Sequence, residues 1–334
     1  MSARPCIAVI GTGGSISTMG RHSLDLYEYN RFGRTVEVEE LLARFPELTD
    51  QFELRPFRFS AIVSIAMGVD DWLSLNRKIT EVVQAEPQVA GVIVPHGTSA
   101  IEETAYFLHL TLKVRVPVVI VGSQRPPNGL GTDAGINLLN AARVAAAPSA
   151  ADLGVLVALN DEIHSAREVT KISNHQVSAF SSIDSGPLGY VDPDGAVTIY
   201  RRPTRRHTAD TEFDVATFGT LPRVDIVYSH VGADGGLVDA AVALGAKAIV
   251  MAGMPPGLEP PAQLESMISA SQSGVLVVQS SRGGSGRVLP RRRELDAGVV
   301  FADNLNPQKS RVLAMLALSV TSEPESIRRM FREY

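Results

Sequence analysis

The segment Cys6-Ile-Ala-Val-Ile-Gly-Thr-Gly-Gly-Ser15 joins a short aliphatic run to a glycine-rich turn that ends in a hydroxyl. A run nearly continuous in aliphatic residues is typical of a strand buried on both faces, as in a parallel sheet covered by helices. The glycines permit a tight turn and bring backbone N–H groups close to a ligand, which open α/β sheets bind at the carboxyl ends of their strands. The segment therefore predicts an α/β fold with Ser15 at a ligand-binding edge of a sheet.

Similar aliphatic runs and amphipathic stretches alternate along the rest of the chain. The aliphatic runs cover 91–95, 117–122, 154–159, 225–228, 247–252 and 274–279. Apolar residues recur at helical three-and-four spacing over 72–85, 100–113, 133–147, 236–244 and 262–273. Alternation of this kind predicts mainly parallel sheets covered by helices.

Capping signals predict three helix starts. The segments 99–102 and 322–325 each begin with serine and end with glutamate, which is the spacing of a capping box. Asn306 followed by Pro307 places a capping side chain and a first-turn proline before another helix.

The polar, proline-bearing segment 201–222 has no strong helical or strand period, so we interpret it as a linker. It separates a larger N-terminal domain over 1–200 from a smaller C-terminal domain over 223–334. A chain of 334 residues is long enough for two packed cores. Each domain is expected to hold a mainly parallel sheet.

Composition narrows the class of partner. The net charge of −5 gives no electrostatic reason to expect nucleic acid, and no apolar stretch of about twenty residues predicts a membrane span. Cys6 is the only cysteine and the seven histidines are scattered, so a structural metal site is not expected. The first apolar run is too short for a signal peptide, which makes the cytoplasm the expected location.

A second hydroxyl-bearing segment is Pro95-His-Gly-Thr-Ser99, which follows an aliphatic run and opens a predicted helix. A helix N-terminus favours an anion, so these hydroxyls can face Ser15 across a crevice at the strand ends. For Ser99, helix capping is a simpler interpretation than a role in binding, because Glu102 completes a capping box. For Thr98, the capping interpretation is weaker. Lys171 can act as a base if desolvation lowers its pKa, although a surface position is the simpler interpretation for any single lysine.

In this order the motifs resemble the bacterial L-asparaginase family. The matching blocks are 12–15, 96–105, 122–126, 133–138, 169–171, 280–282 and 304–309. The resemblance spans essentially the whole chain, from Ile10 to Tyr334. It implies hydrolysis of a small carboxamide substrate without metal or cofactor, in a homodimer or homotetramer with sites at the subunit interface.

The resemblance also implies roles for single residues. Ser15 stands where the family normally has a threonine nucleophile. A tyrosine from a flexible loop normally assists that nucleophile, and Tyr29 or Tyr27 is the nearest candidate. A second set in the family combines a threonine, an aspartate and a lysine, and Thr98 and Lys171 match two of these.

The positions implied to bind substrate depart from the family. Ser99 stands where the family has the aspartate. Ser64 corresponds to the serine that binds the α-carboxylate, and Ile65 follows it where the family has a polar residue. Backbone N–H groups at Gly14 and Gly97 are expected to contact the substrate and its oxyanion.

The C-terminal half departs as well. The family has a glycine-asparagine pair that reaches into the neighbouring subunit's site, and this chain has Gly-Met-Pro-Pro-Gly over 253–257. Glu294 is the candidate for the acidic residue that also arrives across the dimer.

These departures predict an altered substrate. A carboxylate beside an ammonium contributes about 1.5–3 kcal/mol, so Ser99 in its place weakens binding of a free amino acid by about one to two decades. We predict that Ser15 forms an acyl-enzyme while Thr98 and Lys171 relay the proton. The substrate is L-asparagine or a related amide, preferably one whose α-amino group is missing, blocked or moved.

Two alternatives remain open from the residues. One is a serine-lysine amidase that uses the glycine- and serine-rich loop 280–286, which follows an aliphatic run. The other is a non-catalytic ligand-binding member of the family, because the aspartate and the intersubunit residues have changed.

Overall fold

The computed structural model describes residues 4–334. The chain forms two compact units, one ending at Thr211 and the other spanning Glu212–Tyr334. The division falls within the segment 201–222, which also contains two short 3-10 helices, Thr208–Asp210 and Val215–Thr217. This polar segment is therefore partly ordered into single turns.

The N-terminal unit is built on an eight-stranded sheet. Its strands are β1 (Cys6–Gly13), β4 (Glu53–Ile62), β5 (Val89–Pro95), β6 (Val118–Val121), β7 (Val155–Leu159), β8 (Glu162–Ser165), β11 (Gly189–Val191) and β12 (Val197–Ile199). The order is β12-β11-β8-β7-β6-β5-β1-β4. The strands from β7 to β4 are parallel, whereas β8, β11 and β12 pair antiparallel with their neighbours. The predicted mainly parallel α/β sheet is confirmed.

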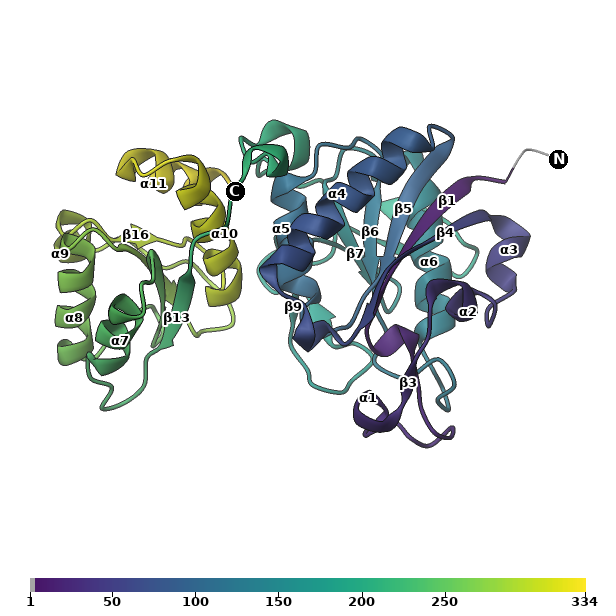
Figure 1. Ribbon diagram of the computed structural model, residues 1–334, viewed down its shortest axis with the longest axis horizontal. Helices are drawn as coiled ribbons and strands as arrows, with labels where there is room; N and C mark the ends of the chain where they lie inside the picture. Colours follow the sequence, from purple (N-terminus) through teal and green to yellow (C-terminus); the bar gives the residue numbers. More distant parts are fainter. Residues whose placement is uncertain (1–3) are drawn as a thin grey trace. The chain divides into compact units, whose positions relative to one another are not determined.

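Helices cover both faces of this sheet (Figure 1). One layer consists of α2 (Val38–Leu42), α3 (Glu47–Gln51) and α6 (Ala134–Ala146), and the other of α4 (Val69–Ala85) and α5 (Ile101–Thr111). Because both faces are covered, residues 7–10 of β1 are fully buried, which explains why the first aliphatic run contains no polar alternation.

Several short elements of the N-terminal unit lie outside the eight-stranded sheet. They are the helix α1 (Tyr29–Phe32), the strand pair β2 (Thr18–Met19) with β3 (Arg34–Thr35), and the strand pair β9 (Thr170–Lys171) with β10 (Phe180–Ser181).

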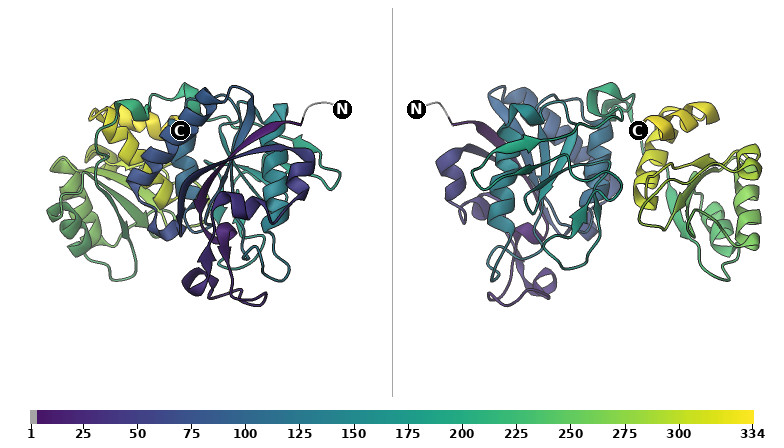
Figure 2. Two further views of the ribbon diagram at one scale, coloured as in Figure 1. Left: turned by 45° about the vertical axis from the view of Figure 1, so that its right-hand side comes forward. Right: turned by 180° about the vertical axis from the view of Figure 1, so that it is seen from behind.

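The C-terminal unit has a wholly parallel sheet. Its elements are β13 (Val224–Tyr228), α7 (Gly236–Ala243), β14 (Ala248–Gly253), α8 (Pro261–Gln272), β15 (Leu276–Ser281), α9 (Arg292–Asp296), β16 (Val300–Phe301), α10 (Pro307–Val320) and α11 (Pro324–Glu333). The strand order is β13-β14-β15-β16. Helices α7 and α8 pack on one face and α10 and α11 on the other (Figure 2).

Two of the predicted helix starts are wrong. Helix α5 begins at Ile101 after Ala100, and Ser99 is exposed and makes no capping bond. At α11 the cap is Glu323, whose carboxylate accepts the N–H groups of Glu325 and Ser326. Both capping-box assignments placed the cap too early because spacing alone does not say at which residue the helical backbone begins.

The third helix start is confirmed. The side chain of Asn306 accepts the N–H of Lys309 over 3.0 Å, and Pro307 occupies the first turn of α10.

Four strands of the larger sheet were not predicted. Strand β4 lies at the edge and carries charged side chains, and β8, β11 and β12 are short. Strands β4 and β12 are the two edges of the sheet and keep one side in solvent, so they lack the continuous aliphatic run that marks a central strand. Strands β8 and β11 are internal but have only four and three residues, which is too short for such a run.

Residues 4–334 contain no helix long and apolar enough to cross a membrane. Within the same range, no three or more His, Cys, Asp or Glu side chains come together in a way that could hold a metal ion. Cys6 is a buried residue of β1, as predicted.

The two outer helices α4 and α5 are joined by buried side-chain hydrogen bonds, which generate a stability prediction. Nδ2 of Asn76 donates to Oγ1 of Thr111 over 3.0 Å, and both residues are buried. Thr111→Val leaves the Asn76 amide without this acceptor and should lower the free energy of unfolding by about 1–3 kcal/mol. Denaturant unfolding measures the change.

The control is the double variant Asn76→Leu/Thr111→Val. Replacing both partners by apolar groups removes the unpaired amide, so part of the lost stability should return. Equal stability of the Thr111→Val variant and the unmodified protein would contradict the role given to this bond.

Candidate active site

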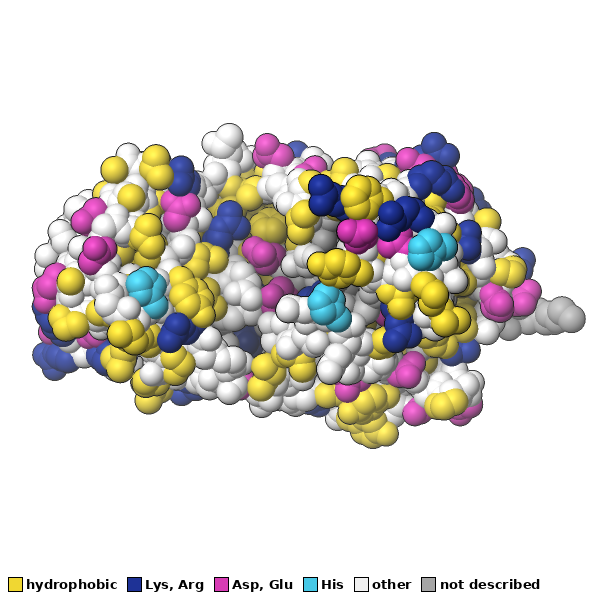
Figure 3. Space-filling model, turned by 90° about the horizontal axis from the view of Figure 1, so that it is seen from below, with side chains coloured by type: hydrophobic (Ala, Val, Ile, Leu, Met, Phe, Trp, Pro, Cys, Tyr) yellow, Lys and Arg dark blue, Asp and Glu magenta, His cyan; other side chains and the backbone are white. Residues whose placement is uncertain are grey.

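A pocket of about 250 Å³ opens at the carboxyl ends of β1 and β5. All of its lining residues belong to the N-terminal unit: Gly14, Ser15, Leu26, Tyr27, Tyr29, Asn30, Val63, Ser64, Ile65, Gly97, Thr98, Ser99, Gln124, Lys171, Asn174 and His175. Every residue predicted for the catalytic and substrate-binding set is among them. Seen from the side of these strand ends, the surface of this unit carries hydrophobic and histidine side chains between the charged ones (Figure 3).

Gly14 and Gly97 bring the two hydroxyl-bearing turns into direct backbone contact. Gly14 has a φ of 78°, and a Cβ there would overlap the amide nitrogen of Gly97. A Cβ on Gly97 would lie 2.6 Å from the Cβ of Ser64 and 3.0 Å from the Cα of Gly14. Only glycine fits at either position, because any side chain would push Ser15 and Thr98 apart.

Ser15 begins a single 3-10 turn, Ser15–Ser17, directly after β1, and its side chain is buried. Its Oγ donates a hydrogen bond of 2.8 Å to the carbonyl oxygen of Ser123. A peptide carbonyl is a good acceptor but a very weak base. If Ser15 acts as a nucleophile, a group other than this carbonyl must therefore take its proton.

The structure distinguishes the two candidate tyrosines. Tyr29, in α1, is only 5% exposed, whereas Tyr27 is 80% exposed. The Tyr29 hydroxyl donates to the carbonyl oxygen of Gln124 over 3.4 Å. Burial raises the pKa of Tyr29, and hydrogen bonding to Asn30 and Ser15 opposes this shift. Tyr29 is therefore the tyrosine beside Ser15, and it is a neutral phenol at neutral pH.

The second hydroxyl is paired with the lysine. Nζ of Lys171 donates to Oγ1 of Thr98 over 2.8 Å. Burial lowers the pKa of Lys171, since desolvation disfavours the ammonium form. A larger fraction of Lys171 is then neutral amine, which can accept a proton from Thr98.

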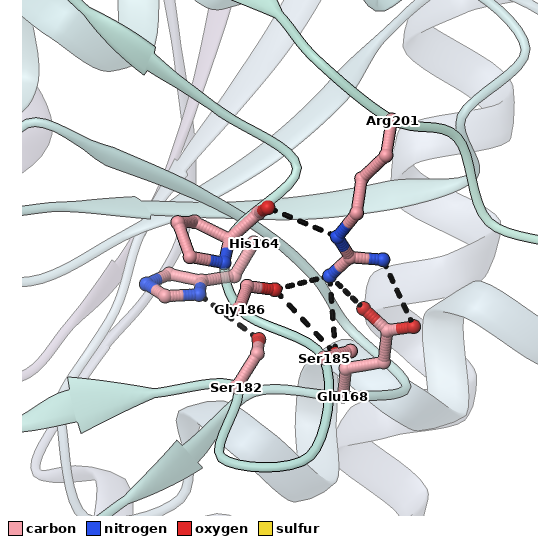
Figure 4. A network of polar contacts seen from close by, with 7 residues as sticks. His164, Glu168, Ser182, Ser185, Gly186 and Arg201 are labelled. Carbon is pink, nitrogen blue, oxygen red and sulfur yellow. Dashed lines mark hydrogen bonds and ion pairs between the residues drawn. The ribbon is translucent and has the colours of Figure 1, made fainter.

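Two polar networks fix the short strand pair that carries Lys171 (Figure 4). Before β9, the guanidinium of Arg201 donates to both carboxylate oxygens of Glu168, over 2.6 and 3.3 Å. After β10, Oγ of Ser182 lies 3.0 Å from Nδ1 of the buried His164. Because β9 and β10 are antiparallel, both contacts lie at the same end of the strand pair, where Thr170 pairs with Ser181, next to the end that carries Lys171. They tie this end to β8 and to the segment after β12.

The part of the pocket lined by Ser99 and Ile65 carries no charged side chain. Ser99 is exposed, and Ile65 leaves 80% of its surface exposed. Among the described residues that line the pocket, none is an aspartate or a glutamate. The N-terminal unit therefore supplies no anionic partner for a substrate ammonium.

Several lining residues were not predicted from the sequence: Asn30, Gln124, Asn174 and His175. The side-chain amides of the asparagines and the glutamine, and the imidazole of the histidine, can form hydrogen bonds with a polar substrate. Nε2 of Gln124 is buried and has no partner within residues 4–334. Gln124 lies in the motif block 122–126, which was a usable signal, whereas nothing in the sequence marks Asn174 or His175.

The first two hydroxyls of the serine-rich loop 280–286 make structural hydrogen bonds. Oγ of Ser280 is buried and donates to the carbonyl oxygen of Leu305 over 2.8 Å. Oγ of Ser281 accepts the N–H of Gly283 over 3.0 Å. Both hydroxyls therefore hold the loop in shape, and the amidase alternative at this loop is not favoured.

Glu294 is also engaged within its own unit. It is buried in α9 and forms an ion pair of 2.6 Å with Arg291. The role predicted for Glu294 in a neighbouring subunit's site remains a prediction.

Two family models match nearly all of the chain. The model described as "Asparaginase, N-terminal" matches residues 6–205, and the model described as "Glutaminase/Asparaginase C-terminal domain" matches residues 223–331.

Individual proteins match over almost their whole length. L-asparaginase 2 of Bacillus subtilis (strain 168) is 39% identical and covers 99% of this chain and 87% of that protein. Glutaminase-asparaginase of Pseudomonas fluorescens biotype A is 37% identical and covers 98% of this chain and 90% of that protein. The crystal structure of a probable cytoplasmic L-asparaginase from Campylobacter jejuni aligns with a TM-score of 0.93 at 36% identity, covering 99% of this chain and 100% of that one. The chain therefore belongs to the bacterial L-asparaginase family.

Proposed function

We propose that the protein is an amidohydrolase of the L-asparaginase type that cleaves a small carboxamide through a hydroxyl nucleophile. One observation carries this proposal. The adjacent strands β1 and β5 each end in a hydroxyl at one pocket, with a buried tyrosine beside Ser15 and a lysine of lowered pKa on Thr98. Such a pair of hydroxyls serves acyl transfer, in which one group attacks and a neighbouring base takes its proton.

In the first step, Oγ of Ser15 attacks the amide carbon and its proton passes to the base formed by Thr98 and Lys171. The backbone N–H groups around Gly97 stabilise the oxyanion that develops on the amide oxygen. The carbon–nitrogen bond then breaks, and the departing nitrogen takes up a proton and leaves as ammonia or an amine.

In the second step, water attacks the ester on Ser15. The proton of this water follows the same route to Thr98 and Lys171. The carbon–oxygen bond to Ser15 breaks, the Ser15 oxygen takes the proton back from this base, and the carboxylic acid leaves. Tyr29 serves as a hydrogen-bond donor that helps to orient Ser15. It is not an ionised base, because burial keeps its phenol protonated.

We further propose that the preferred substrate lacks a free α-ammonium group, or carries it blocked or moved. Ser99 and Ile65 place a hydroxyl and an aliphatic side chain where an ammonium would require a carboxylate. Ser64 is buried at the base of the pocket and remains the proposed partner of a substrate carboxylate. Simple ω-amides of dicarboxylic acids satisfy both conditions.

The quaternary structure and location are also proposals. A homodimer or homotetramer with sites between subunits follows from the family resemblance. The cytoplasm is supported by the Campylobacter jejuni relative, which is described as cytoplasmic, although the Haemophilus influenzae relative is named as periplasmic.

The nucleophile is tested by Ser15→Ala. Because attack needs the Ser15 oxygen, we expect kcat for ammonia release from the best amide to fall by about 10³-fold or more. A mass increase on the peptide that contains Ser15 should appear after rapid acid quenching of the unmodified protein. Ser281→Ala is the matched control and should leave turnover unchanged. Full turnover by Ser15→Ala, or silence of the unmodified protein across a broad amide panel, would contradict the proposal.

The proposed base predicts a pH profile. Thr98 can pass a proton only to neutral Lys171, so kcat/KM should rise with pH as Lys171 loses its proton. Burial lowers the pKa of Lys171, which moves this rise below the pH at which an ordinary lysine titrates, near 10.5. Lys171→Met should abolish the rising limb and reduce kcat by about 10²–10⁴-fold. An identical profile in the variant would exclude Lys171 as the base.

Substrate preference is tested by Ser99→Asp. The restored carboxylate should raise kcat/KM for L-asparagine about 10- to 100-fold, which corresponds to about 1.5–3 kcal/mol for one charge-assisted hydrogen bond. For succinamic acid, which has no α-amino group, the same change should lower kcat/KM. Parallel ammonia-release assays with both amides measure the ratio, and an unchanged ratio would refute the assignment.

A further inference from the structure

Asp133 occupies the N-cap position of α6 but does not cap that helix. Aspartate is a preferred capping residue, yet the carboxylate of Asp133 accepts no N–H group of α6. The side chain is only 5% exposed and is directed at the segment that follows β6. There its Oδ2 accepts the N–H of Gln124 over 2.9 Å, and its Oδ1 accepts the N–H of Arg125 over 3.0 Å.

The peptide groups held by Asp133 are the ones that contact the proposed catalytic hydroxyls. The N–H of Gln124 and the carbonyl of Ser123 belong to one peptide group, and this carbonyl accepts Oγ of Ser15 over 2.8 Å. The N–H of Arg125 and the carbonyl of Gln124 belong to the next peptide group, and this carbonyl accepts the Tyr29 hydroxyl over 3.4 Å.

We propose that Asp133 is a positioning residue whose carboxylate holds and polarises the two consecutive peptide groups that orient Ser15 and Tyr29. This inference rests on the proposed function, in which Ser15 is the nucleophile. An anionic acceptor on an N–H draws electron density toward the carbonyl of the same peptide group, so that carbonyl becomes a stronger acceptor. One carboxylate therefore sets the direction of both hydroxyls.

The surroundings of Asp133 suit this role. Nδ2 of Asn137, one helical turn later in α6, donates to Oδ2 of Asp133 over 3.1 Å and to the carbonyl oxygen of Gly122 over 3.0 Å. The carboxylate also lies at the N-terminus of α6, where the helix dipole favours a negative charge. Burial is the main cause of the raised pKa of Tyr29, and the negative charge of Asp133 contributes in the same direction.

The first experiment compares Asp133→Asn and Asp133→Ser. Asparagine keeps the shape but loses the charge, and serine still caps α6 but has no carboxylate for the loop. For both variants we expect kcat to fall about 10- to 100-fold with little change in KM, because orientation of the nucleophile is lost while the substrate contacts remain. Glu323→Gln is the matched control. Its carboxylate also accepts two backbone N–H groups, at the start of α11 in the other unit, and its loss should leave kcat unchanged.

A double-mutant cycle with Tyr29→Phe distinguishes the proposed positioning role of Asp133 from a merely structural role. If Asp133 acts through the peptide group that holds Tyr29, the double variant should lose less activity than the product of the two single losses. Multiplicative losses, or kcat values in Asp133→Asn that follow only the folded fraction, would overturn the proposal. Wild-type turnover by both Asp133 variants would overturn it as well.

A second measurement keeps the test valid if the Asp133 variants do not fold. Ser15→Ala should shift the amide proton of Gln124 and leave that of Arg125 in place. Tyr29→Phe should shift the amide proton of Arg125 and leave that of Gln124 in place. Selective ¹⁵N labelling of glutamine and arginine makes both signals observable. Two unmoved signals, or the same shift for both variants, would show that the two peptide groups are not coupled to the hydroxyls in this way.

The outcomes also distinguish this inference from the proposed function. Absence of amide hydrolysis by the unmodified protein refutes the function, whereas the crossed pattern of amide shifts does not depend on turnover. An active unmodified protein whose Asp133 variants are equally active refutes only the positioning role.

Discussion

The backbone contact between Gly14 and Gly97 is the constraint on which the rest of the site depends. It sets the distance between two turns that follow neighbouring parallel strands. The two backbones lie so close together that neither glycine has room for a Cβ atom. Strands β1 and β5 are buried on both faces, so neither turn can shift without moving the core. The hydroxyls of Ser15 and Thr98 are thereby held at one pocket by the rigid centre of the fold.

The two hydroxyls lie in different electrostatic surroundings. Ser15 and the neighbouring Tyr29 donate to peptide carbonyls, which orient them but cannot take a proton. Thr98 accepts from Lys171, whose pKa is lowered by burial. The proposed mechanism thus assigns orientation and proton transfer to different groups, and the role we propose for Asp133 extends the orienting side through the peptide groups that it holds. The ion pair of Glu168 and Arg201 supports the side that transfers the proton.

Substrate recognition is separable from this chemistry. The side chains at Ser99 and Ile65 belong to the pocket but not to the hydrogen bonds that join the catalytic groups. Under the proposed function, a change at these positions would alter which amide is bound without removing the nucleophile or the base. Such an arrangement would let a family fold keep its acyl-transfer residues while its substrate preference changes.

The sequence by itself determined the α/β class, the family and those pocket-lining residues that lie in its motifs, such as Ser15, Thr98 and Lys171, because these follow from local hydrophobic runs and from the order of short motifs. It did not determine β4 and β12, whose residues are partly exposed at the edges of the sheet, nor β8 and β11, which are too short to show such a run. Only the tertiary structure decided between Tyr29 and Tyr27, and it alone revealed that the carboxylate of Asp133 serves the segment after β6. The physical reason is distance along the chain. The bond from Ser15 joins residues 108 positions apart, and the bond from Lys171 joins residues 73 positions apart, so no local pattern records either contact.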